Sequence, residues 1–232
     1  MVELLAAELG GRGTALEVGV GTGQVALPLH AAGIPVVGMD LSRPMMDRLI
    51  HKAGGRSPFP LVQGDATRMP FADGAFGAAY LRWVLHLIPD WKGALAEVVR
   101  VVREGGVFAV SIGMYFGPRS EIQERFAELA GVSLEPPGLT WGGYDRLDEA
   151  MEALGATARE LPSITESEHE NLEAFLDGIA RNRYSWTWKV EDPERLASVA
   201  AEVRAWAEER FGSLDGPRET FEIMWRSYDL PG

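Results

Sequence analysis

The chain contains no cysteine, and only four of its 232 residues are histidine. The absence of cysteine excludes disulfide bonds, thiolate metal sites and cysteine nucleophiles, and it fits a reducing compartment. The four histidines are scattered, with no pair four residues apart and no cluster of carboxylates around them. We therefore expect no metal site.

Long apolar runs and an excess of positive charge are missing too. No run approaches the roughly 18 residues of a membrane span, and the N-terminus lacks the basic start and apolar stretch of a secretory signal. Lysine and arginine total 22 against 34 aspartates and glutamates, and the net charge of −12 would repel a phosphate backbone. We expect a cytoplasmic protein that has no membrane span and binds small molecules rather than nucleic acid. Nothing in the sequence indicates its oligomeric state.

Short β-rich runs alternate with helical runs through the first half of the chain. Strands are expected at residues 14–20, 34–40, 59–65, 76–83 and 107–113. Helices are expected at residues 22–33, 42–55 and 90–106. This alternation predicts an α/β fold with a doubly wound parallel sheet, in which ligands bind beyond the carboxyl ends of the strands.

The segment ALEVGVGTGQVALPL, residues 15–29, places three glycines at alternate positions directly after the first expected strand. Gly19, Gly21 and Gly23 let the backbone turn sharply and let a ligand approach without meeting a β-carbon. Thr22 to Gln24 are expected to begin a helix, and the free N–H groups of its first turn favour polar groups of a ligand. The segment therefore predicts a loop that holds a ligand.

Two kinds of nucleotide loop fit this spacing. One is Gly19-x-Gly21-x-Gly23 preceded by Glu17, and the other is Gly21-x-Gly23-x-x-Ala26, which satisfies the dinucleotide-binding fingerprint of NAD-dependent oxidoreductases. Asp40, at the end of the second expected strand, can accept hydrogen bonds from ribose hydroxyls in either scheme. The loop alone leaves both alternatives open.

The third expected strand favours the first alternative. Asp65 stands at its end, where a carboxylate can accept a hydrogen bond from an adenine amino group, and Ala66 follows it. The chain resembles the class I S-adenosylmethionine-dependent methyltransferases, particularly the small-molecule branch that includes quinone-biosynthesis enzymes. The resemblance covers residues 14 to about 113 and rests on LEVGVGTG, Asp40, GDATRMPF, the F-x-x-x-Y strand before VLHLIPD, and the Glu-Gly-Gly turn before the fifth strand.

The resemblance implies S-adenosyl-L-methionine as the cofactor and a single Rossmann-like domain over residues 1–232. In this pattern the first two glycines lie against the methionine part of the cofactor, Asp40 holds the ribose, Asp65 and Ala66 frame the adenine, and Leu81 meets the sulfonium side. The cofactor-binding residues implied are Glu17, which would steady the loop, and Gly19, Gly21, Gly23, Gln24, Asp40, Leu41, Asp65, Ala66 and Leu81.

Three features depart from the family pattern. Gly77 stands where the family commonly has Asp, and Glu104 replaces the usual Pro of the glycine turn. Relatives often have a longer helical segment before the first strand. We therefore expect either a more open cofactor pocket or a start that lies further upstream.

The reaction implied is transfer of the sulfonium methyl group by in-line displacement to an O, N, S or C atom of a small molecule. His86 follows the fourth strand and is either a general base or a packed, hydrogen-bonded histidine. Arg82 is the second catalytic candidate and can bind an acidic group of the substrate. The alternatives are an NAD-dependent oxidoreductase and a non-catalytic protein that binds S-adenosylmethionine.

The second half of the chain raises the question of the substrate. Helices are expected at about 118–130 and 144–154, a sixth strand at 156–167 and a final strand at 218–230, antiparallel to its neighbours by the family topology. A tight hairpin could join the last two strands, yet about 50 residues separate them. We expect residues 168–216 to form a helical lid, with one helix near 171–183 and another over 193–211.

The segment RNRYSWTWKV lies between the two expected lid helices. If it is extended, Trp186 and Trp188 share one face. The aromatic residues either pack the lid onto the sheet or form an aromatic wall for an apolar or planar substrate. The candidate substrate-binding residues are Arg82, Tyr115, Trp141, Tyr184, Trp186 and Trp188.

Overall fold

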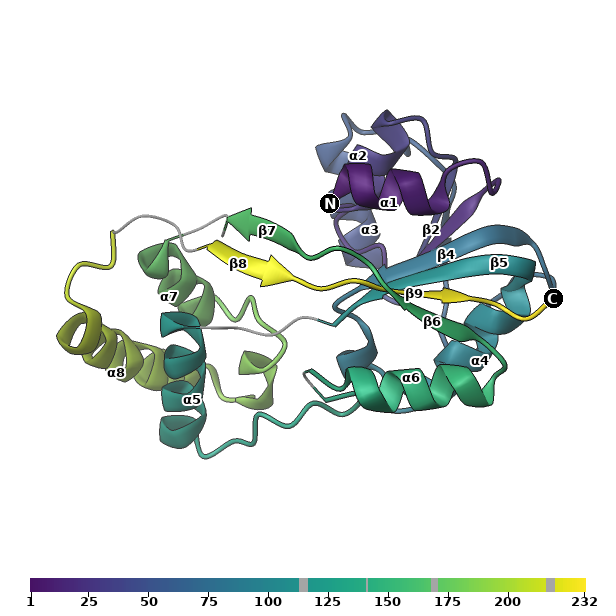
Figure 1. Cartoon of the computed structure of the whole chain (residues 1–232). Coiled ribbons are helices and arrows are strands. Elements are labelled where there is room, and N and C mark those ends of the chain that lie inside the picture. The colour runs from purple at the N-terminus through teal and green to yellow at the C-terminus, as the bar shows by residue number, and fades with distance from the viewer. Residues whose placement is uncertain (113–116, 141, 168–170, 216–219) are drawn as a thin grey trace. The chain divides into compact units, whose positions relative to one another are not determined.

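The computed structural model describes residues 1–112, 117–140, 142–167, 171–215 and 220–232 (Figure 1). The chain divides into two compact units. The first unit comprises Met1–Gly113, Pro137–Ile164 and Met224–Gly232, and the second comprises Met114–Pro136 and Thr165–Ile223.

A sheet runs through the first unit, and in the described part of the chain it has seven strands in the order β3-β2-β1-β4-β5-β9-β6. The strands are β1 (Ala15–Val18), β2 (Val36–Asp40), β3 (Leu61–Gln63), β4 (Phe76–Arg82), β5 (Val102–Ser111), β6 (Thr157–Glu160) and β9 (Arg226–Asp229). Strands β1 to β5 pair in parallel, and β9 lies antiparallel between β5 and β6. This arrangement confirms the predicted doubly wound, mainly parallel sheet with an antiparallel last strand.

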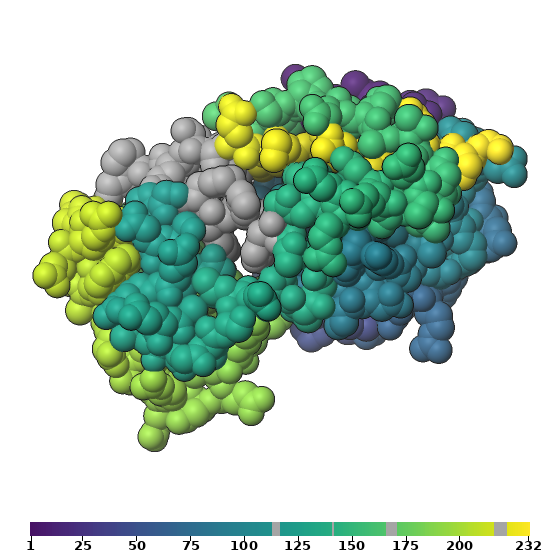
Figure 2. All heavy atoms as spheres, turned by 60° about the horizontal axis from the view of Figure 1, so that its bottom comes forward, coloured from purple at the N-terminus to yellow at the C-terminus, as the bar shows by residue number. Residues whose placement is uncertain are grey.

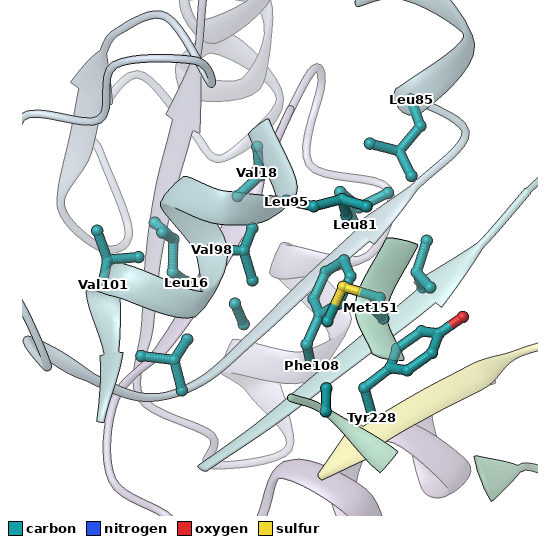
Figure 3. Close-up of a cluster of buried hydrophobic side chains, with 14 of the residues drawn as sticks. Leu16, Val18, Leu81, Leu85, Leu95, Val98, Val101, Phe108, Met151 and Tyr228 are labelled. Atoms are coloured by element: carbon teal, nitrogen blue, oxygen red, sulfur yellow. The ribbon is translucent and has the colours of Figure 1, made fainter. Parts of the chain in front are cut away.

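Helices cover both faces of the sheet (Figure 1). One face carries α1 (Val2–Leu9), α2 (Ala26–Ala31) and α3 (Arg43–Lys52), and the other carries α4 (Trp91–Val101) and α6 (Tyr144–Ala153). Because both faces are covered, the central strands consist of almost continuous apolar residues. Figure 3 shows part of the resulting core, in which leucines and valines of β1 and β4 meet those of α4 and the ring of Phe108 stacks on that of Tyr228 with centroids 6.0 Å apart.

Several element boundaries differ from those expected. The helix after the glycine loop begins at Ala26 rather than at residue 22, because positive φ angles at Gly21 and Gly23 keep that segment in a turn. The expected sixth strand divides into β6 and β7 (Ile164–Ser167), and the expected final strand divides into β8 (Thr220–Ile223) and β9. Strands β7 and β8 pair with each other outside the seven-stranded sheet.

An ion-pair network joins the three chain segments of the first unit. The Arg159 guanidinium in β6 donates to both carboxylate oxygens of Asp229 in β9, at 2.7 and 3.0 Å, and also to Glu8 of α1. The Ser227 hydroxyl donates to the same Glu8 oxygen at 2.6 Å. Figure 2 shows the last segment, in yellow, beside residues 137–164, in green. The start of the chain is thus bonded to its last strand.

The second unit is helical, with α5 (Pro118–Ala130), α7 (Leu172–Ala180) and α8 (Pro193–Phe211) around an apolar core. The bounds of α8 confirm the expected helix, and the Asp192 side chain accepts a hydrogen bond from the Glu194 N–H as its N-cap. The unit includes α5, which the predicted insertion over residues 168–216 left out. None of the described helices of the chain is both long and apolar enough to cross a membrane.

Candidate active site

The glycine loop lies at the carboxyl end of β1 and folds against β2. The N–H groups of Gly19 and Val20 both donate to the Met39 carbonyl, at 2.8 and 2.9 Å. Gly19 has a φ of +75°, and a β-carbon there would lie 2.5 Å from a methyl carbon of Val84, which follows β4. Only glycine fits this position, because the backbone is left-handed and a neighbouring side chain occupies the space.

Glu17 is buried in β1, with 3% of its surface exposed. Its Oε2 accepts a hydrogen bond from the Tyr80 hydroxyl at 3.1 Å, and its carboxyl group also accepts one from the Ala26 N–H at the start of α2. Burial raises the pKa of Glu17 to about 8, although both hydrogen bonds and the charge of Arg82 act in the opposite direction. This geometry places Glu17 where it holds β1, β4 and the start of α2 together.

Asp40 ends β2 and reaches back to the glycine loop. Its Oδ2 accepts a hydrogen bond from the Gly21 N–H at 2.7 Å, and its Oδ1 accepts one from the Ser42 N–H at 2.8 Å. Leu41, the next residue, exposes 71% of its surface, and its carbonyl accepts a hydrogen bond from the Gln63 side chain at 3.1 Å. An acidic and an apolar side chain therefore stand next to each other beside the loop.

Asp65 follows β3 and is exposed. Its Oδ1 accepts hydrogen bonds from both the N–H and the hydroxyl of Thr67, each at 2.8 Å. These bonds lower the pKa of Asp65, so it is ionised at neutral pH. Ala66 is half-buried beside it at the edge of the core. Thr67 and Gln63 are not among the site residues expected from the sequence, although an Asp-x-Thr segment is a known signal for such a turn.

Leu81, in β4, is a buried residue with 1% of its surface exposed. The side chain is buried in the core with Leu95 of α4 (Figure 3). Successive residues of a strand point to opposite faces, and the neighbouring Tyr80 already takes the side of Glu17. The expectation that Leu81 meets the sulfonium side of the cofactor stays a prediction.

Arg82 ends β4 and lies close to the start of the chain. One of its guanidinium nitrogens is 3.6 Å from the Met1 sulfur, and its Cζ lies 4.3 Å from the centre of the Trp83 ring. Trp83 has a φ of +58°, an unusual value for a residue with a side chain, which ends the strand's alternation. Arg82 and Trp83 therefore lie together, although successive residues of a regular strand point to opposite faces of the sheet. Binding of a substrate's acidic group by Arg82 stays a prediction.

His86 lies in a short 3₁₀ helix, η1 (Leu85–Leu87), with 7% of its surface exposed. Burial lowers its pKa to about 4, so the imidazole is neutral at pH 7 but is a weak base. Its carbonyl accepts a hydrogen bond from the Gly138 N–H at 3.0 Å. The geometry favours the packed histidine over the general base.

The segment of the second unit that carries two candidate tryptophans is not extended, so the condition under which they would share one face is not met. Trp186 is 5% exposed and stacks on Tyr184 with ring centroids 5.5 Å apart, whereas Trp188 is 56% exposed and donates to the Asn182 carbonyl at 3.0 Å. The two diverge because the segment forms a 3₁₀ helix, η2 (Thr187–Lys189), instead of an extended strand. The remaining aromatic candidates, Tyr115 and Trp141, lie outside the described residues.

Gly77 and Gly23 occupy tight places. A β-carbon on Gly77 would lie 1.5 Å from the Arg12 carbonyl oxygen, so the Asp common in the family cannot be accommodated. A β-carbon on Gly23 would lie 2.9 Å from Leu27. Gln24 is exposed next to it, ahead of α2. Across the described ranges, no three His, Asp or Glu side chains are grouped so that they could hold a metal ion.

The glycine loop, Asp40 and Asp65 lie at the carboxyl ends of three adjacent strands, β1, β2 and β3. The strand order reverses between β1 and β4, and such a reversal is where open α/β sheets bind ligands. The half-buried backbone of Gly19 and Gly21, two carboxylates and an exposed leucine can together accommodate the polar ribose and apolar base of a nucleoside.

Comparison with known proteins shows that this chain is similar to methyltransferases. A family model described as a methyltransferase domain matches residues 16–110. The chain is 28% identical over 188 residues to the demethylmenaquinone methyltransferase of Desulfitobacterium hafniense, covering 73% of each protein. It is 37% identical over 153 residues to the demethylmenaquinone methyltransferase of Thermus thermophilus, covering 61% of this chain and 67% of the relative.

Solved structures share the fold. The YcgJ protein of Bacillus subtilis matches with a TM-score of 0.63 at 17% identity, covering 100% of this chain and 97% of that one. The chain therefore belongs to the class I S-adenosylmethionine-dependent methyltransferases, in a branch similar to the enzymes of quinone biosynthesis, and it is an enzyme that transfers a methyl group to a small-molecule acceptor.

Proposed function

We propose that the residues after β1, β2 and β3 bind S-adenosyl-L-methionine, with Asp40 at the ribose. The observation that carries this proposal is the hydrogen bond from the Gly21 N–H to Asp40, which joins the glycine loop to the carboxylate. Each Asp40 oxygen accepts one backbone N–H, and a carboxylate offers about four acceptor positions in all. Capacity remains for the two ribose hydroxyls.

The adenine would lie between Leu41 and the turn that begins at Asp65. Leu41 has 71% of its surface exposed, so removing its side chain from water lowers the free energy of the complex. The planar base has the apolar area that can cover it. Asp65 keeps one oxygen outside its bonds to Thr67, and that oxygen can accept a hydrogen bond from the adenine amino group. Both features fit the base of the cofactor.

The bound cofactor supplies an already activated methyl group, so this chain's residues chiefly align the acceptor and exclude water. Glu17 contributes by fixing the start of α2 and β4 around the loop. His86 is too weak a base to remove a proton efficiently at pH 7. The acceptor therefore reacts through an atom that is already nucleophilic or loses its proton to another group.

We further propose that the second unit, with the predicted lid over residues 168–216, selects the acceptor. The topology of the first unit supports this. The chain leaves β5 and β6 at their carboxyl ends and re-enters β9 at the same edge, because β9 is antiparallel to both. Both relatives are named for methyl transfer to demethylmenaquinone, so a quinone of that kind is the first acceptor to test.

Calorimetry with S-adenosylhomocysteine, in chelator, tests the cofactor site. Asp40→Ala should weaken binding by about 1.5–3 kcal/mol, the range for losing hydrogen bonds to a charged group. Asp47→Ala is the matched control, since Asp47 forms an exposed ion pair with Arg43 on α3 and should leave binding unchanged. Preferential binding of NADH, or equal affinities of the two variants, would contradict the assignment.

The acceptor is tested separately by incubating the enzyme with cofactor carrying a labelled methyl group and a short-chain demethylmenaquinone analogue. Mass spectrometry should find the label on the quinone. Labelling of other compounds in a metabolite extract, with none on the quinone, would keep the methyltransferase assignment and reject this acceptor.

A further inference from the structure

Tyr144, the first residue of α6, uses its hydroxyl as a bridge between two distant chain segments. The oxygen accepts a hydrogen bond from the Ile112 N–H at 3.0 Å and donates one to the Met224 carbonyl at 2.8 Å. The side chain is buried in the core of the first unit, and burial raises its pKa, so the hydroxyl keeps the proton that it donates.

The two partners of this hydroxyl stand where the chain passes between the units. Ile112 directly follows β5, and the first unit's opening segment ends at Gly113. Met224 is the first residue of the last segment of that unit, two residues before β9. One hydroxyl therefore fixes both the departure of the chain from the sheet and its final return.

The chain also re-enters the first unit at Pro137, and the residues that follow are hydrogen-bonded to the turn after β4. The N–H groups of Gly138 and Leu139 donate to the carbonyls of His86 and Leu85, at 3.0 and 3.1 Å. A β-carbon on Gly138 would lie 2.1 Å from the Leu85 carbonyl oxygen, so the two segments are in close contact. The connections to the second unit are thus held after β4, after β5 and before β9.

The Tyr144 ring is held independently of its hydroxyl. The Arg226 guanidinium carbon lies 5.3 Å from the ring centre, and Arg226 pairs with Asp148 at 3.1 Å and with Glu160 at 2.6 Å. Replacement by phenylalanine should therefore leave the ring in place and remove the hydrogen bonds of the hydroxyl to Ile112 and Met224.

We propose that Tyr144 is a positioning residue for methyl transfer, which pins Ile112 and Met224 and thereby sets the path of the chain to the residues that select the acceptor. This inference rests on the proposed role of the second unit in acceptor selection. Tyr144 acts through the backbone of its two partners, and its loss should leave the glycine loop and Asp40 intact.

The test compares Tyr144→Phe with a matched control, Tyr228→Phe. Tyr228 is also a buried tyrosine of the first unit, and its hydroxyl donates to Asp148 at 2.6 Å instead of bonding to Ile112 or Met224. Hydrogen exchange at the Ile112 amide should become roughly tenfold faster in Tyr144→Phe and stay unchanged in Tyr228→Phe, since only the first variant removes that amide's hydrogen-bond acceptor.

Kinetics separate positioning from a purely structural role. Tyr144→Phe should raise the acceptor KM or lower kcat several-fold while the affinity for S-adenosylhomocysteine and the circular dichroism spectrum stay the same, and Tyr228→Phe should change none of them. Faster exchange with unchanged acceptor kinetics would overturn the inference, as would equal exchange in the two variants. A wild type that transfers no methyl group rejects the proposed function and the positioning role with it, whereas normal transfer by the wild type with unchanged acceptor kinetics in Tyr144→Phe rejects the positioning role alone.

Discussion

The buried carboxyl group of Glu17 should make the stability of the protein fall as pH rises. Its pKa is about 8 in the folded protein against an ordinary value of 4.5. Between these two pH values the folded state keeps a proton that the unfolded chain has released, so the free energy of unfolding decreases by about 1.4 kcal/mol for each pH unit. Over the whole interval the loss attributable to Glu17 amounts to about 5 kcal/mol.

Glu17→Gln isolates this contribution. The amide is uncharged at every pH and still offers an oxygen to the Tyr80 hydroxyl, so the variant should lack this pH dependence. Urea unfolding followed by circular dichroism at pH 5, 6, 7 and 8 gives the free energy of unfolding of each protein. The wild type should lose stability relative to Glu17→Gln at each step, since all other titrating groups are shared.

Glu97→Gln provides the control of opposite sign. Hydrogen bonds from Arg100 lower the pKa of Glu97, so its contribution is lost only as pH falls below about 4.5 and its difference from wild type should stay constant between pH 5 and 8. A difference between wild type and Glu17→Gln that is likewise constant over this range would refute the reasoning, because it would mean that Glu17 is ionised in the fold.

Three further predictions concern the site and the second unit. Burial lowers the pKa of His86 to about 4, so the folded protein keeps this imidazole neutral at pH values where the unfolded chain protonates it. The free energy of unfolding of the wild type should therefore fall by about 3 kcal/mol relative to His86→Gln as the pH is lowered from 6.5 to 4. The dependence of kcat on pH should show no inflection from His86 near pH 6.5. Trp186→Ala should cost about 3–5 kcal/mol by thermal melting, and Trp188→Ala less than about 1 kcal/mol; equal losses would contradict the observed burial. Gly19→Ala should abolish binding of S-adenosylhomocysteine in calorimetry, and adding Val84→Ala should restore it only in part, since it relieves the contact but not the positive φ; full restoration would show that φ is not limiting.

Elements with strong local signals could be predicted from the sequence. Asp90 and Asp192 cap α4 and α8 through their side chains. The short β-rich runs between the expected helices correspond to β1, β2 and β4. The candidate cofactor residues Asp40 and Asp65 do follow neighbouring strands, because the carboxyl ends of parallel strands meet at one edge of a sheet.

Features that depend on tertiary contacts could not be predicted. The 3₁₀ turn that separates Trp186 from Trp188 is held by the buried Thr187, whose hydroxyl donates to Asn182 Oδ1 at 2.6 Å. Which face of β4 is covered by α4 depends on packing between separate elements, as does the grouping of α5 with α7 and α8. Local patterns carry no information about such partners.

The position of β9 between β5 and β6 has a consequence for folding during synthesis. In the described sheet β6 pairs only with β9, and the Arg159 network that bonds α1 to this edge also needs Ser227 and Asp229. Until residues 224–232 have left the ribosome, β6 has no strand of this sheet to pair with, although every residue of the second unit precedes them in the chain. The sheet can therefore close only once this last segment has joined it, and until then the outer edge of β5 stays open to other strands.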